Sequence, residues 1–291
     1  MNKFLALICT HNPKIQHITE QLNSINESSN EIEIVVYDFN SSDFFLNFLK
    51  NRKIKFFHFK EANGPKLSFI KAFKHVQANF TFNYVYVVDQ DDIWLKRKHE
   101  IVKNYISIDE NVDLIFHDVR ILLDYGKETK LDESYYFKKH RNPLIELTEY
   151  HLQSANPIIG HTLCVSSNLL MEFNRYEYSF FFPMHDWALA YFAISNEYKL
   201  AYIDMQLSHY RIHQNNVLGL NESNKMSYRY FKTKRDYLNK IASLVLILNN
   251  KNKLKSILSS LFRIKSSILL KKRLIFELLL LLKLLTKIKK C

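Results

Sequence analysis

Hydrophobic and polar positions form alternating blocks along the first hundred residues. Four apolar runs have the length and composition of buried strands: residues 4–9, 32–37, 54–59 and 84–88. Two segments between them carry apolar residues at helical spacing, residues 15–25 and 69–76. Strands that alternate with helices predict an α/β domain with a parallel sheet and helices on both of its faces.

The pattern continues less regularly to about residue 220. We expect a helix after Trp94, a strand at residues 113–118, a polar loop at 124–150 and a strand at 157–166. The segment "MHDWALAYFAI" then predicts a loop that opens a buried helix, and residues 199–216 close the globular part. The predicted organisation is one domain over residues 1–220, followed by a second region over residues 221–291.

Polar clusters follow three of the predicted strands. They are Thr10-His11-Asn12, Asp38 with the "NSSD" that follows it, and the acidic run from Asp89 to Asp92. Parallel sheets bind ligands in the crevice outside the carboxyl ends of their strands. We therefore expect the three clusters to converge on one crevice.

The acidic run interrupts a chain that is otherwise basic. Clustered carboxylates repel one another and lose hydration, so they persist where a ligand or partner offsets that cost. Residues i and i+2 of a strand point to the same side, which places Asp89 and Asp91 toward one ligand. Two oxygen ligands suit Mg²⁺ or Mn²⁺ bound together with a diphosphate. The alternative is a solvated turn in which Asp92 caps the next helix.

Charge is concentrated in the C-terminal region. The chain holds 41 Lys and Arg against 29 Asp and Glu, a formal net charge of +12, and the residues after Lys225 are rich in Lys, Leu and Ile. The longest apolar stretch, residues 274–285, is too short to cross a bilayer, which needs ~20 apolar residues. Region 221–291 is therefore predicted to form a basic, helical, amphipathic tail on an anionic membrane surface. The alternative is a helical hairpin packed on the domain.

Composition excludes several other classes. Cys9, Cys164 and Cys291 are too widely spaced for a disulfide framework or a zinc site, which fits a reducing compartment. The N-terminal "MNKFLALICTHNP" reads as a core strand rather than a signal peptide. No nucleic-acid recognition motif accompanies the basic charge, so no nucleic-acid partner is expected. A nucleotidyltransferase would bring a Gly- and Lys/Arg-rich phosphate loop near its N-terminus, which this sequence lacks.

Six segments, in order, resemble one enzyme family. "VVDQDDIWLKRK" is similar to the acidic segment of inverting family 2 glycosyltransferases of the GT-A fold, especially their bacterial rhamnosyltransferase-like branch. The other five are "ALICTHNP", "IEIVVYDFNSSD", "NGPKLSFIKAF", "HDWALA" and "YRIHQNNVLG". The resemblance covers roughly residues 3–219. It implies a Rossmann-like, mostly parallel central sheet with helices on both faces.

The resemblance also implies roles for particular residues on the donor side. Asp89 and Asp91 match the family's DxD motif, which holds Mg²⁺ or Mn²⁺ against the diphosphate, and Asp91 is the expected direct ligand. His213 matches a histidine near the metal; the alternative for it is a histidine that donates to a backbone carbonyl. The expected nucleotide-binding residues are Thr10, His11, Asn12, Asp38, Lys66 and Asp89.

Asp186 is the residue expected to act as the catalytic base. An inverting transferase needs a group that takes the proton of the acceptor hydroxyl as it attacks the sugar. A carboxylate at the start of a helix is aimed by the local backbone, although Asp186 could instead merely cap that helix. The expected acceptor pocket consists of Gly160, His185 and Trp187, and core packing is the alternative for Trp187.

Three positions depart from the family pattern. Phe39 stands where the family has a second Asp after Asp38, Asn40 replaces a Gly, and Lys96 stands where a Pro is usual. The first departure predicts an altered preference for the nucleobase.

The expected function is transfer of a sugar from dTDP-rhamnose or a UDP-hexose to a saccharide or lipid-linked saccharide. This fits synthesis of bacterial surface polysaccharide or lipopolysaccharide by a cytoplasmic enzyme bound to the inner face of the cytoplasmic membrane. The alternative is an inactive, transferase-like subunit of a membrane-associated glycan assembly complex.

Overall fold

The computed structural model describes residues 2–61, 64–124, 129–132, 152, 156, 158–175, 182 and 184–213. Apart from Phe182, all of these belong to one compact unit of the chain. The predicted tail over residues 221–291 lies outside the described residues, as does most of the predicted loop at 124–150. The boundary between the two expected regions therefore stays a prediction.

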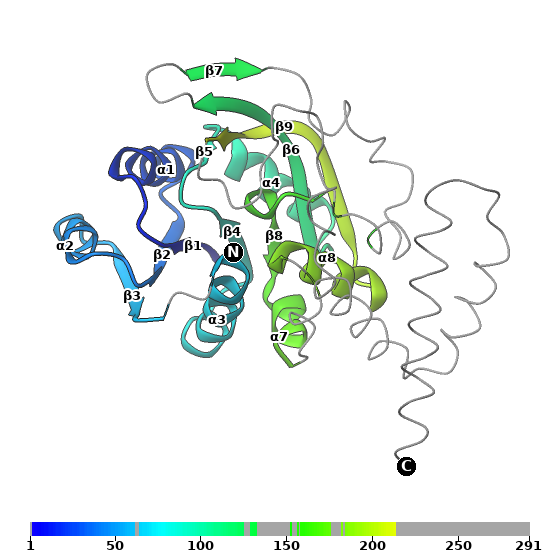
Figure 1. Ribbon diagram of the computed structural model, residues 1–291. Helices are drawn as coiled ribbons and strands as arrows, with labels where there is room; N and C mark the ends of the chain where they lie inside the picture. Colours follow the sequence, from blue (N-terminus) through cyan, green and yellow to red (C-terminus); the bar gives the residue numbers. More distant parts are fainter. Residues whose placement is uncertain are drawn as a thin grey trace, which may run out of the picture. The chain divides into compact units, whose positions relative to one another are not determined.

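One nine-stranded sheet organises the described part of the chain (Figure 1). Its order is β3-β2-β1-β4-β8-β6-β9-β5, and β7 pairs with β6. The first four strands are parallel: β1 (Phe4–Thr10), β2 (Ile32–Phe39), β3 (Lys55–Phe59) and β4 (Tyr84–Val88). Thr10 lies opposite Asp38 in the register, so the carboxyl ends of these strands meet at one edge. This half confirms the predicted parallel sheet.

The second half of the sheet is mixed. It consists of β5 (Ile93–Trp94), β6 (Leu114–Asp124), β7 (Thr129–Asp132), β8 (Cys164–Ser166) and β9 (Leu200–Ile212). β8 runs antiparallel to both β4 and β6, while β6 and β9 are parallel with an irregular register around Asp118. The short β5 pairs antiparallel with β9 at the far edge of the sheet. Directly after the acidic run, the chain therefore passes from β4 in the middle of the sheet to this edge.

Helices cover both faces of the sheet, as predicted. α1 (Ile15–Ser28) and α4 (Lys98–Ile108) contact each other on one face. α3 (Gly64–Asn79), α7 (Ser167–Arg175) and α8 (His185–Ser195) contact one another on the opposite face (Figure 1). α2 (Asp43–Asn51) buries Phe45 and Leu49 in the same apolar cluster as the buried face of α1.

Burial explains why these segments form these elements. Every residue of β1 and β4 is buried, because a parallel strand is covered on both faces and needs a continuous apolar sequence. α8 is apolar on all sides, and all but one of its residues are buried. Among the described helices, none combines the length and the apolar composition that crossing a membrane requires.

Two predicted elements were wrong in detail. The predicted strand at residues 157–166 is a 3₁₀ turn, η1 (Gly160–Thr162), followed by the three residues of β8. The turn closes through hydrogen bonds from Thr162 N to Ile159 O and from Leu163 N to Gly160 O. The apolar composition of this segment therefore did not distinguish a buried turn from a strand. Within the predicted loop at 124–150, residues 129–132 form β7, which pairs with the extended end of β6.

Candidate active site

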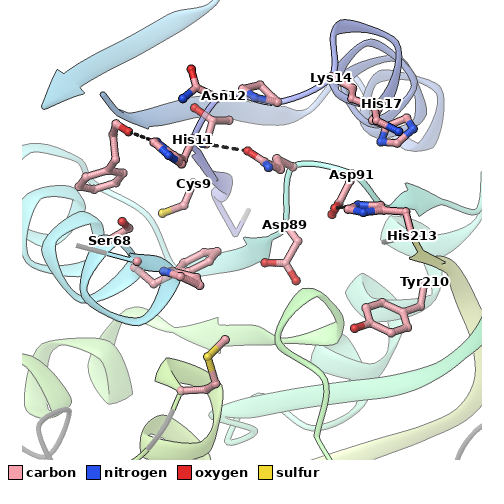
Figure 2. Close-up of a pocket in the computed structure, with 18 residues that line it drawn as sticks. Cys9, His11, Asn12, Lys14, His17, Ser68, Asp89, Asp91, Tyr210 and His213 are labelled. Carbon is pink, nitrogen blue, oxygen red and sulfur yellow. Dashed lines mark hydrogen bonds and ion pairs between the residues drawn. The ribbon is translucent and has the colours of Figure 1, made fainter. Parts of the chain in front are cut away.

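A pocket of about 550 Å³ opens where β1, β2 and β4 end (Figure 2). Three segments supply most of its polar lining: the turn after β1, the acidic turn after β4 and the end of β9. Their lining residues are Thr10, His11, Asn12, Lys14, Asp89, Gln90, Asp91, Tyr210 and His213. The first and third polar clusters meet at one crevice as predicted, whereas no residue of the second, Asp38 with the "NSSD" that follows it, lines this pocket.

Hydrogen bonds lock the turns of the pocket to one another. The backbone N–H of His11 donates to the Gln90 side chain (2.9 Å), and its Nδ1 lies 2.6 Å from the carbonyl oxygen of Phe39. The N–H of Asn12 donates to Ser41 Oγ at 2.7 Å. Three turns that are distant in sequence thus form one rigid rim.

Asp38 supports this rim from inside rather than lining the pocket. Its buried carboxylate accepts hydrogen bonds from Thr10 Oγ1 (2.9 Å) and the Ser41 N–H (3.1 Å), and it pairs with His58 Nδ1 at 2.8 Å. Lys66, also expected to bind the nucleotide, lies in the first turn of α3 and is not among the pocket-lining residues.

The departures at residues 39 and 40 leave the turn after β2 intact. Asn40 has φ +60°, the left-handed conformation for which glycine and asparagine are the usual residues. Its N–H donates to Phe59 O at 2.7 Å. Phe39 lines the pocket, so an apolar side chain is present where a second carboxylate would offer polar contacts.

The aspartates of the acidic turn differ in their surroundings: two line the pocket and one is buried. Asp89 and Asp91 line the pocket, and Asp91 Oδ2 lies 2.7 Å from His213 Nε2 (Figure 2). Asp92 is fully buried and accepts a hydrogen bond from the Arg211 N–H at 2.8 Å. Because α4 begins only at Lys98, Asp92 is not its cap. Burial, followed by the charges of neighbouring aspartates, raises the pKa of Asp89 well above its usual range.

Two sets of potential metal ligands share Asp89. In the described part of the chain, the cluster whose ligand atoms all lie within 4.8 Å of one another is Asp89, Asp92 and His161. The set expected from sequence is Asp89, Asp91 and His213, and all three of its members line the pocket. Both sets combine carboxylate oxygens with an imidazole nitrogen, a donor combination that Mn²⁺ accepts.

Asp186 lies in the first turn of α8, beside the acidic turn. The helix begins at His185, and Asp186 Oδ1 accepts a hydrogen bond from the Trp187 N–H at 2.6 Å. Burial raises the pKa of Asp186 to about 7, and the N–H groups of Trp187 and Gly160 oppose that rise. The charge of Asp186 in turn contributes to the raised pKa of Asp89. A carboxylate with a pKa near 7 can accept a proton at neutral pH.

Two of the three expected acceptor residues gather around Asp186. A Cβ atom on Gly160 would lie 3.2 Å from His185 Nε2 and 3.4 Å from Asp186 Oδ2. The His185 ring stacks on Phe69 with centroids 3.8 Å apart, and burial lowers its pKa to about 3, so the ring is neutral. The third, Trp187, is buried, and its indole N–H donates to Leu152 O at 2.6 Å.

Sequence reasoning missed several residues that shape this site. Arg211 is almost fully buried, donates from Nε to Asp91 O at 2.7 Å and pairs with Glu20. His17 lines the pocket and lies 2.9 Å from Asp124 through its Nε2. The signal for Arg211 was present, because it lies two residues before His213 at the end of a predicted segment. His17 was hidden among the polar residues of an amphipathic helix.

Comparisons with known proteins agree on one family and fold. Residues 6–159 match the model of the family described as glycosyl transferase family 2. A dTDP-rhamnosyl transferase of Shigella flexneri, RfbG, is 27% identical over 228 residues, which cover 73% of this chain and 74% of that protein.

Solved structures are similar at lower identity. TarS (residues 1–349) of S. aureus in complex with UDP has a TM-score of 0.57 at 17% identity, over 85% of this chain and 66% of that chain. In another TarS structure the covered share of that chain is 60%, so this chain spans under two thirds of TarS. Mannosyltransferase PcManGT of Pyrobaculum calidifontis, in complex with GDP-Man and Mn2+, has a TM-score of 0.53 at 13% identity, over 95% of this chain and 69% of that one. The predicted GT-A fold is thereby confirmed.

Proposed function

The chain belongs to glycosyl transferase family 2, and we propose that it is a metal-dependent, inverting transferase that moves a sugar from a nucleotide diphosphate to a saccharide acceptor. The position of Asp186 carries this proposal. It is a buried carboxylate with a pKa raised to about 7, and it lies close enough to Asp89 of the pocket for the two charges to interact. An acid–base group of this pKa beside a nucleotide-sized pocket suits transfer to a hydroxyl group.

The donor is dTDP-rhamnose or a UDP-hexose. The similar Shigella flexneri protein is a dTDP-rhamnosyl transferase, and the similar solved structures are complexes with UDP and with GDP-Man. The rim built from Thr10, His11 and Asn12 would hold the nucleoside, with Phe39 against the base. The acceptor is a saccharide or lipid-linked saccharide of a bacterial surface polysaccharide or lipopolysaccharide.

Asp89, Asp91 and His213 would hold Mg²⁺ or Mn²⁺. Asp91 and His213 are in direct contact and open to the pocket, where a diphosphate has access. The competing cluster is less suitable, because Asp92 and His161 are fully buried and the Lys98 ammonium donates to the His161 carbonyl. A bound divalent cation would neutralise charge on the departing diphosphate.

The reaction would then need no covalent intermediate. Asp186 takes the proton of the acceptor hydroxyl while that oxygen bonds to C1 of the sugar. The bond between C1 and the diphosphate oxygen breaks on the opposite face, and its electron pair leaves with the diphosphate. Gly160 and neutral His185 border the Asp186 carboxylate, so they would shape the approach of the acceptor.

A donor screen tests this proposal. Each candidate sugar nucleotide is added with Mn²⁺, and the melting temperature is measured, because a ligand at 100 times its Kd stabilises by ~2.7 kcal/mol. The donor that stabilises is then assayed for transfer, with NMR to determine the anomer of the product. A retained anomeric configuration would refute inversion. Donor binding without transfer to any saccharide would favour the inactive-subunit alternative.

We propose separately that residues 221–291 hold the enzyme on the inner face of the cytoplasmic membrane. The support is compositional: lysines alternate with apolar stretches too short to span a bilayer. The full chain is expected to sediment with anionic vesicles and to be partly released by high salt, which screens the lysines. Protein truncated at about Leu254 should stay in solution. Sedimentation of the truncated protein with the same vesicles would contradict the proposal.

A further inference from the structure

Lys98 is a fully buried cation that the proposed reaction does not use. It is the first residue of α4, and its ammonium donates to the carbonyl oxygen of His161 at 3.0 Å. The same nitrogen lies 4.1 Å from the centre of the Trp94 ring, an additional cation–π contact.

A lysine is an expensive residue at this position. Burial lowers its pKa to about 7, which reflects the cost of keeping an ammonium group away from water. It also lies at the amino end of a helix, where the helix dipole disfavours a cation. A Leu or Met of similar volume would avoid both costs, so packing alone is a poor explanation for the charge.

The group that Lys98 holds is the turn η1, and His161 within it faces the acidic turn. His161 Nδ1 lies 2.9 Å from Asp92 Oδ2, and its Nε2 lies 2.8 Å from Ser208 Oγ. Its ring stacks on Tyr210, which lines the pocket, with centroids 5.4 Å apart. One residue of η1 therefore contacts both the acidic turn and a wall of the pocket.

The preceding residue of the same turn faces the proposed base. The Gly160 N–H interacts with the Asp186 carboxylate, and the Gly160 backbone packs close to His185 and Asp186. The turn is only three residues long and is closed by its own hydrogen bonds, so a shift at His161 moves Gly160 as well.

We propose that Lys98 is a positioning residue that locks η1 between the acidic turn and Asp186, and so fixes the distance between donor and base. The inference rests on the proposed role of Asp186 as the base. It assigns Lys98 no contact with either substrate.

Lys98→Met tests the inference, because methionine keeps the unbranched stem and removes the ammonium. We expect kcat to fall on the order of 100-fold, the effect of misplacing a catalytic group by about 1 Å. Donor KM should change far less than kcat, because the hydrogen bond from the His11 N–H to Gln90 joins the rim of the pocket without η1. Lys103→Met is the matched control: it removes a lysine of the same helix whose partner is Glu31, distant from the site. Its kcat should equal that of the wild type.

A lower melting temperature for Lys98→Met with an unchanged kcat would overturn the inference, because Lys98 would then serve packing alone. If this variant does not fold, Ser208→Ala decides, since it removes the other polar support of His161. A reduced kcat in Ser208→Ala supports the lock, and an unchanged kcat overturns it. Asp186→Asn, assayed in parallel, separates the two claims: wild-type turnover there would refute the base itself, whatever Lys98 does.

Discussion

Asp91 and Asp186 are two carboxylates of one site in opposite environments. Asp91 faces the pocket and contacts His213, and its backbone carbonyl accepts a hydrogen bond from Arg211. Asp186 is buried, and the interactions that oppose its raised pKa come from N–H groups and the Asn156 side chain rather than from a cation. The first environment presents a carboxylate to a ligand in the pocket, and the second raises the pKa of Asp186 to about 7, where the group can gain and lose a proton.

This difference in environment supports the roles proposed for the two carboxylates. Enzymes that need two carboxyl groups for different tasks separate their pKa values through burial and through neighbouring charges. Here the two carboxylates come from different parts of the fold, because Asp91 follows the parallel strand β4 while Asp186 lies in the first turn of α8.

Asp186→Asn should have the largest effect of the substitutions that test the difference between Asp91 and Asp186. Asparagine keeps the shape but cannot take a proton, and base catalysis typically contributes 10²–10⁴-fold, so turnover should fall by about that factor. Wild-type kcat should rise with pH through about 7, where Asp186 loses its proton, and the variant should lack this dependence.

Stability gives the control for this variant. Burial raises the pKa of Asp186 from its unfolded value of 3.8 to about 7. The contribution of this group to the free energy of unfolding is therefore fully present below pH 3.8 and is lost as the pH rises through about 7. At pH 8 Asp186→Asn should therefore melt no lower than the wild type, since it removes a buried charge. Near-normal turnover in Asp186→Asn would show that Asp186 serves only the start of the helix, where Asn and Asp are nearly equal.

Asp91→Asn should act on the other member of the pair. Loss of a ligand charge should weaken Mn²⁺ binding by at least the roughly 10–100-fold that outer-shell changes cost, and with it the stabilisation by donor. Asp43→Asn, at an exposed position of α2, is the control and should bind Mn²⁺ normally. Calorimetric titration with Mn²⁺ measures the effect. Unchanged Mn²⁺ affinity in Asp91→Asn would transfer the metal role to Asp92 and His161.

Gly160→Ala should have the smallest effect of these substitutions, and it tests whether Asp186 can be disturbed without disturbing Asp91. The added methyl group would meet the His185 ring at 3.2 Å and Asp186 Oδ2 at 3.4 Å, so both side chains must move by tenths of an ångström. Overpacking of this kind costs ~1–3 kcal/mol, and we expect turnover to fall on the order of tenfold. Mn²⁺ affinity should be unchanged, because Asp91 is not displaced. A loss of Mn²⁺ binding instead would mean that the two carboxylates are not independent.

The parallel half of the fold could be predicted because its signals are local. β1 and β4 are uninterrupted apolar runs, and the polar clusters after them identify the pocket edge without any long-range information. The turn η1 escaped prediction because Gly160 and His161 are determined by distant partners, Asp186 and Asp92. α2 was missed because it buries only two residues, too few to make a clear helical pattern.

The same distinction applies to the site residues. Asp89, Asp91 and His213 were predictable because their segments resemble a known family, and they do line one pocket. The burial of Asp38 and Asp92 could not be predicted, because a sequence does not reveal whether a carboxylate after a strand points outward or into its own turn. Buried cations such as Lys98 give even less signal, since lysine is ordinarily a surface residue.

The pairing of β5 with β9 has a consequence for the order in which the protein matures. Asp91 and His213 are 122 positions apart, and β5 gains its partner only when β9 has been synthesised. Contacts of such long sequence separation close late in folding, and domains are made from the N-terminus onward. A nascent chain thus contains the turns after β1, β2 and β4 well before the contact between Asp91 and His213 can form.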